Sequence, residues 1–308
     1  MNILPDYSLM SIIITNFEAS FQNHTTMAKY LDPKADLTFK RIFGEHPHLV
    51  MSLLNALLPL SKGQEIKDIE YLSPERVPRT SIGKNSIVDV FCKTKDGRCF
   101  IVEMQMYWST NFKDRVLFNS AKVYVDQLEH AEDFSELQPV YSLNLVDANF
   151  EKDVPEFIHY YRMVHEKYTE KVIDGLHLVF VELKKFKPQS IIERKMTVLW
   201  LRFLTEINKK TEEVPQELLE NDDIRQAVEL VQESAYTREQ LMGYDLFWDQ
   251  VRLDKEKATE AERRYKAGLK EGIEENKREN ARRMKADGMS VELIAKYTGL
   301  SAEEINDL

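Results

Sequence analysis

Two apolar runs separated by a short polar turn constrain this chain more than any other feature. Residues 86–94 and 98–106 are rich in β-branched and aromatic side chains, a pattern that predicts a β-hairpin. Polar residues interrupt both runs: Asp89 lies in the first, and Glu103 and Gln105 lie in the second. A charged side chain within an apolar strand is costly unless it is paired or bound to a metal ion. These three residues are therefore candidates for chemistry.

The length of the turn decides whether Asp89 and Glu103 share a face of the hairpin. A two-residue loop at 96–97 would turn Asp89 away from Glu103. A three-residue loop at 95–97 would place the two residues directly opposite each other, with Gly97 in the left-handed conformation that glycine tolerates. The residues permit both registers, and the chemistry of a shared site favours the second.

Two carboxylates that lie side by side repel each other, and one divalent cation relieves that repulsion. Mg²⁺ prefers oxygen ligands of this kind, and Mn²⁺ can substitute for it. A metal ion held by Asp89 and Glu103 would activate water and stabilise charge on a phosphoryl oxygen. Gln105 shares the face of Glu103 because strand side chains repeat every two residues. Its amide can hold a water molecule or a phosphate oxygen, but it supplies no positive charge.

The remaining segments predict an α/β fold, with a mixed sheet flanked by helices and a helical C-terminal extension. A first helix begins at Asp36, where apolar and basic residues alternate, and Gly44 ends it. Further helices are expected at 48–58, at 113–128 and within 191–249, and further strands at 66–72, 139–147, 157–165 and 176–183.

Composition and charge exclude several classes of protein. The chain has 308 residues, enough for two units, and a net charge of −10, whereas a protein that simply coats nucleic acid is basic. Any contact with DNA must therefore use a local basic patch or a metal ion. No apolar run reaches the roughly 18 residues of a membrane span, so no membrane partner is expected. The two cysteines do not suggest a disulfide framework, and we expect a cytoplasmic protein.

Shifts in composition divide the chain into four segments. Residues 1–26 contain no Lys or Arg and are expected to form an N-terminal extension, and residues 27–250 carry the core. Residues 251–284 mix charges of both signs, which predicts an exposed helix that either links two parts or joins copies of the chain into a homo-oligomer. Residues 285–308 predict a small helix-turn-helix-like tail, or a plain helical hairpin, whose second helix is acidic.

Three features together resemble a known family. They are the opening motif LDPKADLTFKRIFGE at 31–45, the hairpin with Asp89, Glu103 and Gln105, and the charged tail. In these features the chain resembles the Rpn family of recombination-promoting nucleases and transposases, which are PD-(D/E)XK nuclease family transposases. The resemblance implies a restriction-endonuclease-like core. It also implies a Mg²⁺-dependent endonuclease that hydrolyses DNA phosphodiester bonds and is linked to recombination and mobile elements.

The family pattern transfers to individual residues. Asp89 and Glu103 would be metal ligands and catalytic residues, and Gln105 would stand in the catalytic position that holds lysine in the wider superfamily. The resemblance also makes Asp36 a further acidic ligand of the metal site. An N-cap of the first helix is the alternative role for Asp36.

Basic residues near these motifs are candidates for DNA binding. Arg115 and Lys122 lie seven positions apart, hence on one face of the helix after the hairpin, and Lys40 lies on the first helix. They could contact phosphates or replace the charge of the missing lysine, or they could belong to a solvated helix face. Because Gln105 is uncharged, a non-catalytic protein that keeps the nuclease fold and binds nucleic acid or a protein partner is the alternative function.

Overall fold

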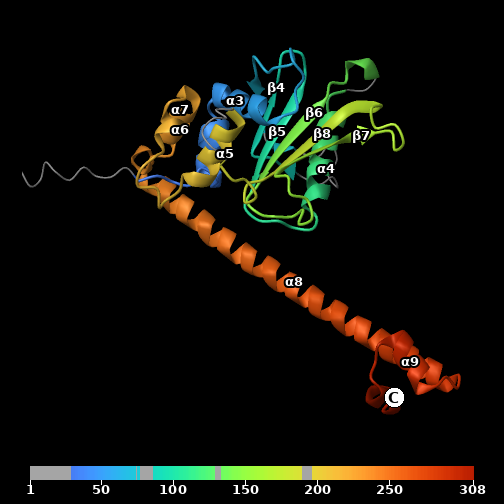
Figure 1. Cartoon of the computed structure of the whole chain (residues 1–308). Helices are drawn as coiled ribbons and strands as arrows, with labels where there is room; N and C mark the ends of the chain where they lie inside the picture. The colour runs from blue at the N-terminus through green and yellow to red at the C-terminus, as the bar shows by residue number, and fades with distance from the viewer. Residues whose placement is uncertain (1–28, 74, 77–85, 129–132, 189–195) are drawn as a thin grey trace, which may run out of the picture. The chain divides into compact units, whose positions relative to one another are not determined.

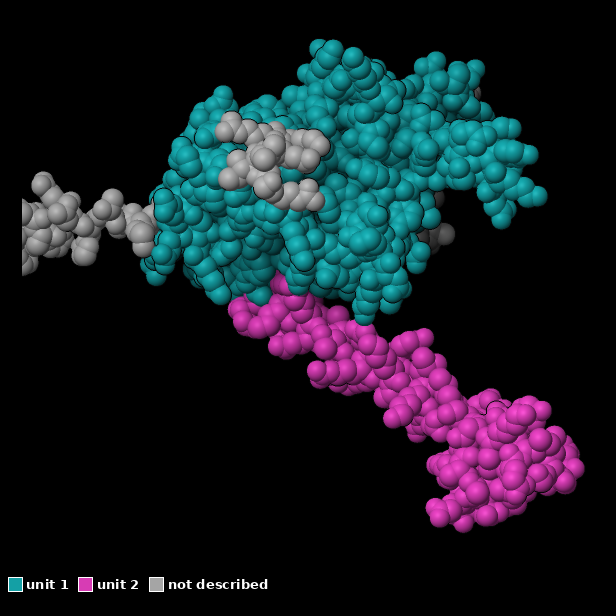
Figure 2. Space-filling model, viewed as in Figure 1, with its two compact units in different colours: residues 1–248 teal, residues 249–308 magenta. Residues whose placement is uncertain are grey.

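The computed structural model describes residues 29–73, 75–76, 86–128, 133–188 and 196–308. The extension expected at 1–26 lies outside these ranges. Contacts divide the chain into two compact units, Met1–Trp248 and Asp249–Leu308 (Figure 2).

The first unit is built on a mixed sheet. Its strands are β1 (Glu70–Tyr71), β4 (Val90–Lys93), β5 (Cys99–Gln105), β6 (Val140–Val146), β7 (Ile158–Val164) and β8 (Val172–Glu182), and β2 (Glu75–Arg76) and β3 (Ser86–Ile87) form a separate pair. The six strands lie in the order β1-β4-β5-β6-β8-β7 (Figure 1). β5, β6 and β8 are parallel, and the register pairs Gln105 with Val146 and Val146 with Glu182. These three strands therefore end at one edge of the sheet.

The hairpin of β4 and β5 has the three-residue turn. Val90 pairs with Val102, and the Thr94 N–H donates to the Arg98 carbonyl over 3.0 Å. Gly97 has a φ of 88°, which a residue with a side chain rarely adopts. The predicted register that sets Asp89 opposite Glu103 is confirmed for the paired residues next to them.

Two strand predictions need correction. The run expected at 86–94 is not one strand, because the chain bends at Asp89 between β3 and β4. The Asp89 side chain, rather than a ladder of backbone groups, accepts the hydrogen bond of the Met104 N–H there. In the run expected at 66–72, only the two residues of β1 pair with β4.

Helices cover both faces of the sheet. α2 (Asp36–Phe43), α3 (Pro47–Leu57), α5 (Met196–Glu206) and α7 (Asp222–Leu230) share one core with inward side chains of β4, β5, β6 and β8, and α6 (Gln216–Leu219) joins this group. α4 (Phe112–Val125) packs on the other face through Phe112, Val116 and Val123. Figure 1 shows α3 and α5 on one side of the sheet and α4 on the other. The α/β architecture expected from the sequence is confirmed.

One long helix contributes residues to both units. α8 runs from Arg238 to Ala286, so it begins well before residue 251, where the charged helix was expected to start. Its start follows from a reciprocal cap: the Thr237 N–H donates to Gln240 Oε1 over 2.9 Å, and the Gln240 N–H donates to Thr237 Oγ1 over 3.3 Å. Within the described ranges, no helix has the length and apolar character needed to cross a bilayer.

The second unit ends in two short helices packed on the end of α8. Ser290 caps α9 (Val291–Thr298), Gly299 turns the chain with a φ of 70°, and a Ser301–Glu304 capping box begins α10 (Ala302–Asn306). Their core consists of Ala281, Ile294, Leu300 and Ile305. The segment therefore forms a helix-turn-helix layout that is held by the last turns of α8.

Candidate functional site

The candidate site lies at the open end of the β4–β5 hairpin. Asp89 directly precedes β4, and its Oδ2 accepts the Met104 N–H over 2.7 Å, which fixes the carboxylate beside β5. Glu103 lies in β5 and points to the face that α4 covers, and its side chain is only 7% exposed. An acid just before β4 and an acid within β5 thus lie at one enclosed corner of the molecule.

The electrostatics of Asp89 show which charges surround it. The pKa of Asp89 is raised from 3.8 to about 6: burial is the largest cause, the charges of Glu103 and Asp36 also raise it, and the Met104 N–H lowers it. Lys40 acts in the opposite direction. The structure thus brings two other predicted site acids and one predicted cation close enough to influence Asp89. A cation placed between Asp89 and Glu103 would relieve the repulsion that raises this pKa.

Two side chains of α4 hold Glu103. The Asn119 amide donates to Glu103 Oε1 over 3.1 Å, and Arg115 Nη2 lies 3.5 Å from Oε2. Burial raises the pKa of Glu103, while Arg115 and Asn119 lower it. The sequence analysis named Arg115 but missed Asn119. The available signal was its position four residues after Arg115, on the same face of the helix.

Gln105 is oriented by the same arginine. Arg115 Nη2 donates to Gln105 Oε1 over 2.8 Å. Because a guanidinium group only donates, the amide oxygen must face Arg115, which leaves the Gln105 amide nitrogen directed elsewhere as a donor. The guanidinium also lies 4.9 Å from the ring centroid of Phe112. Arg115 therefore places a positive charge next to both Glu103 and Gln105.

Lys122 is not among the residues whose contacts with Glu103 or Gln105 are described above. It lies about 10 Å further along the axis of α4 than Arg115, given a rise of about 1.5 Å per residue. Its side chain is partly buried near the C-terminal end of the helix. A phosphate bound by Lys122 would therefore be a different one from a phosphate bound by Arg115.

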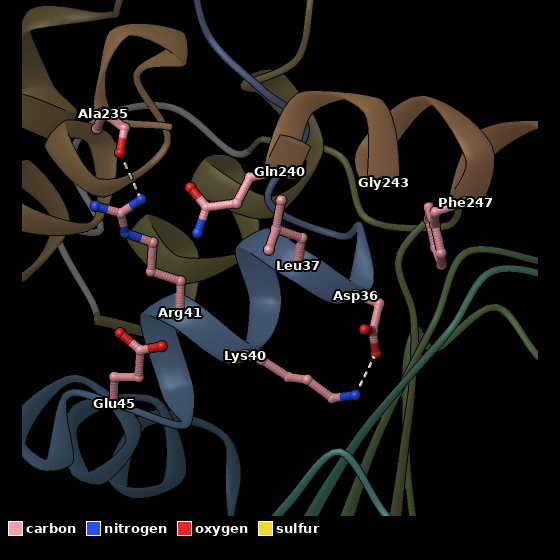
Figure 3. A pocket seen from close by; sticks show the side chains of 9 residues that line it. All are labelled: Asp36, Leu37, Lys40, Arg41, Glu45, Ala235, Gln240, Gly243 and Phe247. Atoms are coloured by element: carbon pink, nitrogen blue, oxygen red, sulfur yellow. Dashed lines mark hydrogen bonds and ion pairs between the residues drawn. The ribbon is translucent and has the colours of Figure 1, made fainter. Parts of the chain in front are cut away.

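Asp36 and Lys40 approach the site from α2. Asp36 is the first residue of α2 and Ala35 is the N-cap, so the alternative role of Asp36 as the cap is wrong. Asp36 Oδ1 lies 2.7 Å from Lys40 Nζ, and both side chains are about half exposed. Figure 3 shows this pair at the rim of a pocket of about 790 Å³ between α2 and the start of α8. Arg41, which also lines this pocket, donates to the Ala235 carbonyl over 2.8 Å. Asp36, Lys40 and Arg41 therefore already have partners within the chain.

Asp32 and Lys34, which precede α2 in the opening motif, hold the start of this helix in place. Lys34 Nζ lies 2.9 Å from Asp32 Oδ1 and donates to the Leu204 carbonyl over 3.0 Å, and both charged side chains are nearly enclosed. The Asp32 N–H donates to the Tyr244 hydroxyl oxygen over 2.9 Å. Burial raises the pKa of Asp32, and Lys34 lowers it. These contacts tie the start of α2 to α5 and α8, which fixes the direction in which Asp36 and Lys40 point.

The residues present fit a Mg²⁺ ion bound partly by protein. In the part of the chain that the structure describes, no three or more Asp, Glu, His or Cys side chains form a group that could enclose a metal ion. Mg²⁺ does not require one, because it commonly takes one or two carboxylates and completes its shell with water and substrate phosphates. Asp89 and Glu103 supply such a pair of carboxylates.

A mixed sheet flanked by helices, with an aspartate just before one strand of a hairpin and a glutamate on the other, defines the class of PD-(D/E)XK nuclease folds. The sequence model described as PD-(D/E)XK nuclease family transposase matches residues 33–262, and the chain belongs to this family. Searches of curated proteins and of solved structures returned no match. Membership confirms the resemblance seen in the sequence and implies a nuclease linked to mobile elements.

Proposed function

We propose that this protein is a metal-dependent endonuclease that hydrolyses phosphodiester bonds of DNA during recombination of mobile elements. The observation that carries the proposal is the enclosed pair of Asp89 and Glu103 on the β4–β5 hairpin. Loss of solvation and the neighbouring charge of Glu103 both disfavour an ionised Asp89, and a bound cation would offset both. The family supports DNA as the substrate.

Mg²⁺ is the proposed cofactor, and Mn²⁺ can substitute. Bound at this site, it would supply the Lewis acidity that activates water and offsets phosphoryl charge. Asp89 and Glu103 would hold the ion, and Asp36 would join as a further ligand from α2 only after its side chain moves, because no three acids of the described residues lie together as a metal site. The salt bridge between Asp36 and Lys40 must then open.

Gln105 and Arg115 together take the place of the lysine in the wider superfamily. Gln105 uses its amide nitrogen to orient the attacking water or a phosphate oxygen, because Arg115 holds its amide oxygen. Arg115 supplies the positive charge that glutamine lacks. The charge therefore comes from α4, while the hydrogen bond comes from β5.

DNA would bind along the basic groups next to these acids. Arg115, Lys122 and Lys40 are the proposed phosphate contacts, from α4 and α2. With a net charge of −10, the chain has no general attraction for DNA, so these local contacts and the metal ion must provide it. We place this activity in the cytoplasm.

The proposed domain division keeps residues 27–250 as the nuclease unit, 251–284 as a charged helical linker and 285–308 as a helix-turn-helix-like tail. The linker would also join copies of the chain, because Tyr265, Leu269 and Ile273 form an exposed apolar stripe at intervals of four residues on α8. Light scattering of the full chain and of a chain ending near Asp249 tests this role. A multimer that survives the truncation would contradict it.

A nicking assay on supercoiled DNA tests the proposed activity. Glu103→Gln should lower the rate by about 10²-fold or more, because losing an electrostatic group of this kind typically costs about 10²–10³. The matched control is Asp96→Asn, an exposed acid at the turn of the same hairpin, which should cut like the unmodified protein. Cleavage that persists in EDTA would refute the metal-dependent mechanism. If the unmodified protein binds DNA but cuts nothing with Mg²⁺ or Mn²⁺, the non-catalytic function is favoured.

A further inference from the structure

We infer that Asn119 is a positioning residue that orients the Glu103 carboxylate for metal binding. This role rests on the proposed metal-dependent function. Asn119 is 3% exposed and projects from α4 towards β5, where its amide nitrogen lies 3.1 Å from Glu103 Oε1. No feature of the sequence had assigned a role to this residue.

The direction of the Asn119 amide is set by Glu103. A carboxylate accepts hydrogen bonds, so only the amide nitrogen can face it, and the amide oxygen must point away. That oxygen is one of two buried side-chain oxygens without a hydrogen-bond partner among the described residues. A buried acceptor without a partner destabilises a fold, and an apolar side chain here would avoid that cost. The hydrogen bond that Asn119 donates to Glu103 explains why an amide, and not an apolar side chain, occupies this position.

Asn119 and Arg115 hold the two oxygens of Glu103 in different ways. Arg115 is 49% exposed, so its guanidinium can leave Oε2 and turn towards a phosphate. Asn119 is enclosed, and α4 is fixed to the sheet on either side of it by Val116 and Val123. The buried amide therefore keeps Oε1 in place while Oε2 is exchanged between partners. Side chains that orient a metal ligand in this manner usually contribute about 10–100-fold to metal affinity.

Equilibrium binding of Mn²⁺ to the full chain, followed by electron paramagnetic resonance without DNA, tests this role. Asn119→Leu keeps a similar volume and removes the donor, and it should weaken Mn²⁺ binding by about tenfold. Asn119→Ala is the second variant, since alanine favours the helix and cannot clash. The matched control is Ser120→Ala, which removes the neighbouring buried hydroxyl, for which the described part of the chain offers no hydrogen-bond partner. It should bind Mn²⁺ like the unmodified protein.

A double-mutant cycle separates positioning from a general effect on the fold. Glu103→Asp draws the carboxylate back by one methylene, out of reach of Asn119. If Asn119 acts through Glu103, Asn119→Leu should cost less than about threefold in that background. Equal losses in both backgrounds, or unchanged Mn²⁺ affinity in folded Asn119→Leu and Asn119→Ala, would overturn the assignment while leaving the nuclease function intact. Absence of Mn²⁺ binding by the unmodified protein would overturn the metal-dependent function and this role with it.

Discussion

Charged residues serve opposite purposes in the hairpin site and in α8. In α8, opposite charges meet along the exposed surface, as in the pair of Lys266 and Glu262, whose side chains are 67% and 58% exposed. In the site, Asp89 and Glu103 carry the same sign and are enclosed. Exposed pairs compensate each other one to one within the helix, whereas among the described residues the two enclosed acids have a single nearby arginine, Arg115, which lies beside Glu103. Incompletely compensated charge, rather than the number of charges, therefore marks the functional region.

The stability of the metal-free protein should show the cost of the enclosed acids most clearly. The pKa of Asp89 is raised to about 6 in the fold from 3.8. The folded state thus binds this proton more tightly, so the carboxyl group stabilises the fold at low pH, and that stabilisation is lost as the pH rises through about 6. Asp89→Asn should be more stable than the unmodified protein at pH 7, by on the order of 3 kcal/mol, and nearly equal to it near pH 4.

Urea unfolding in EDTA at both pH values measures this difference. Asp96→Asn is the control, because the pKa of that exposed carboxyl is lowered by its hydrogen bond with Thr94. A lowered pKa means that the fold favours the ionised form of Asp96, so Asp96→Asn should gain no stability at pH 7. Lower stability of Asp89→Asn than of the unmodified protein at pH 7 would show that Asp89 is already compensated within the chain.

Removing the charge of Arg115 should reduce catalysis more than binding. Arg115→Met keeps the apolar part of the side chain and should lower the nicking rate by about 10²-fold, because a charge beside the reacting groups is lost. Arg225→Met is a matched control, since Arg225 is a half-exposed arginine paired with Asp222 on α7. Single-turnover rates at saturating DNA separate the two effects. An equal loss in both variants would deny Arg115 a special role.

Moving the charge from α4 to β5 should restore part of that activity. Gln105→Lys alone places two cations next to each other, because Arg115 lies 2.8 Å from Gln105. In the Arg115→Met background this repulsion is absent, and the new lysine should raise the nicking rate about tenfold above that of Arg115→Met. A double variant no faster than Arg115→Met would show that the site cannot use a charge at position 105.

The exposed pairs of α8 should have the smallest effect. Glu262→Gln breaks the pair with Lys266, whose atoms lie 2.6 Å apart, and should lower stability by about 0.3–0.5 kcal/mol. The difference should vanish in about 1 M salt, because screening removes the interaction between exposed charges. Chemical unfolding at two salt concentrations measures it. A loss above about 2 kcal/mol would show that this surface is not simply solvated.

Local patterns in the sequence predicted much of the hairpin but few of the contacts that hold its acidic residues in place. The register followed from turn length and from the need of Asp89 and Glu103 for one site, and both depend on neighbouring residues. The contact of Asn119 with Glu103 depends on how α4 packs on the sheet, which no periodicity determines. The same holds for Lys34, whose partner carbonyl at Leu204 lies 170 positions away. The early start of α8 was missed because the cap formed by Thr237 and Gln240 was not recognised.

The three-residue turn at 95–97 makes this site sensitive to the length of the chain at a place remote from the chemistry. Because strand side chains alternate between faces, deleting or inserting one residue in the turn would shift β4 against β5 by one position. Asp89 would then face away from Glu103, although every residue of the site was still present. Exchange of side chains in the turn is comparatively harmless, provided that Gly97 keeps its φ of 88°. During divergence of such sequences, selection would thus act on the number of residues between the strands more strongly than on their identity.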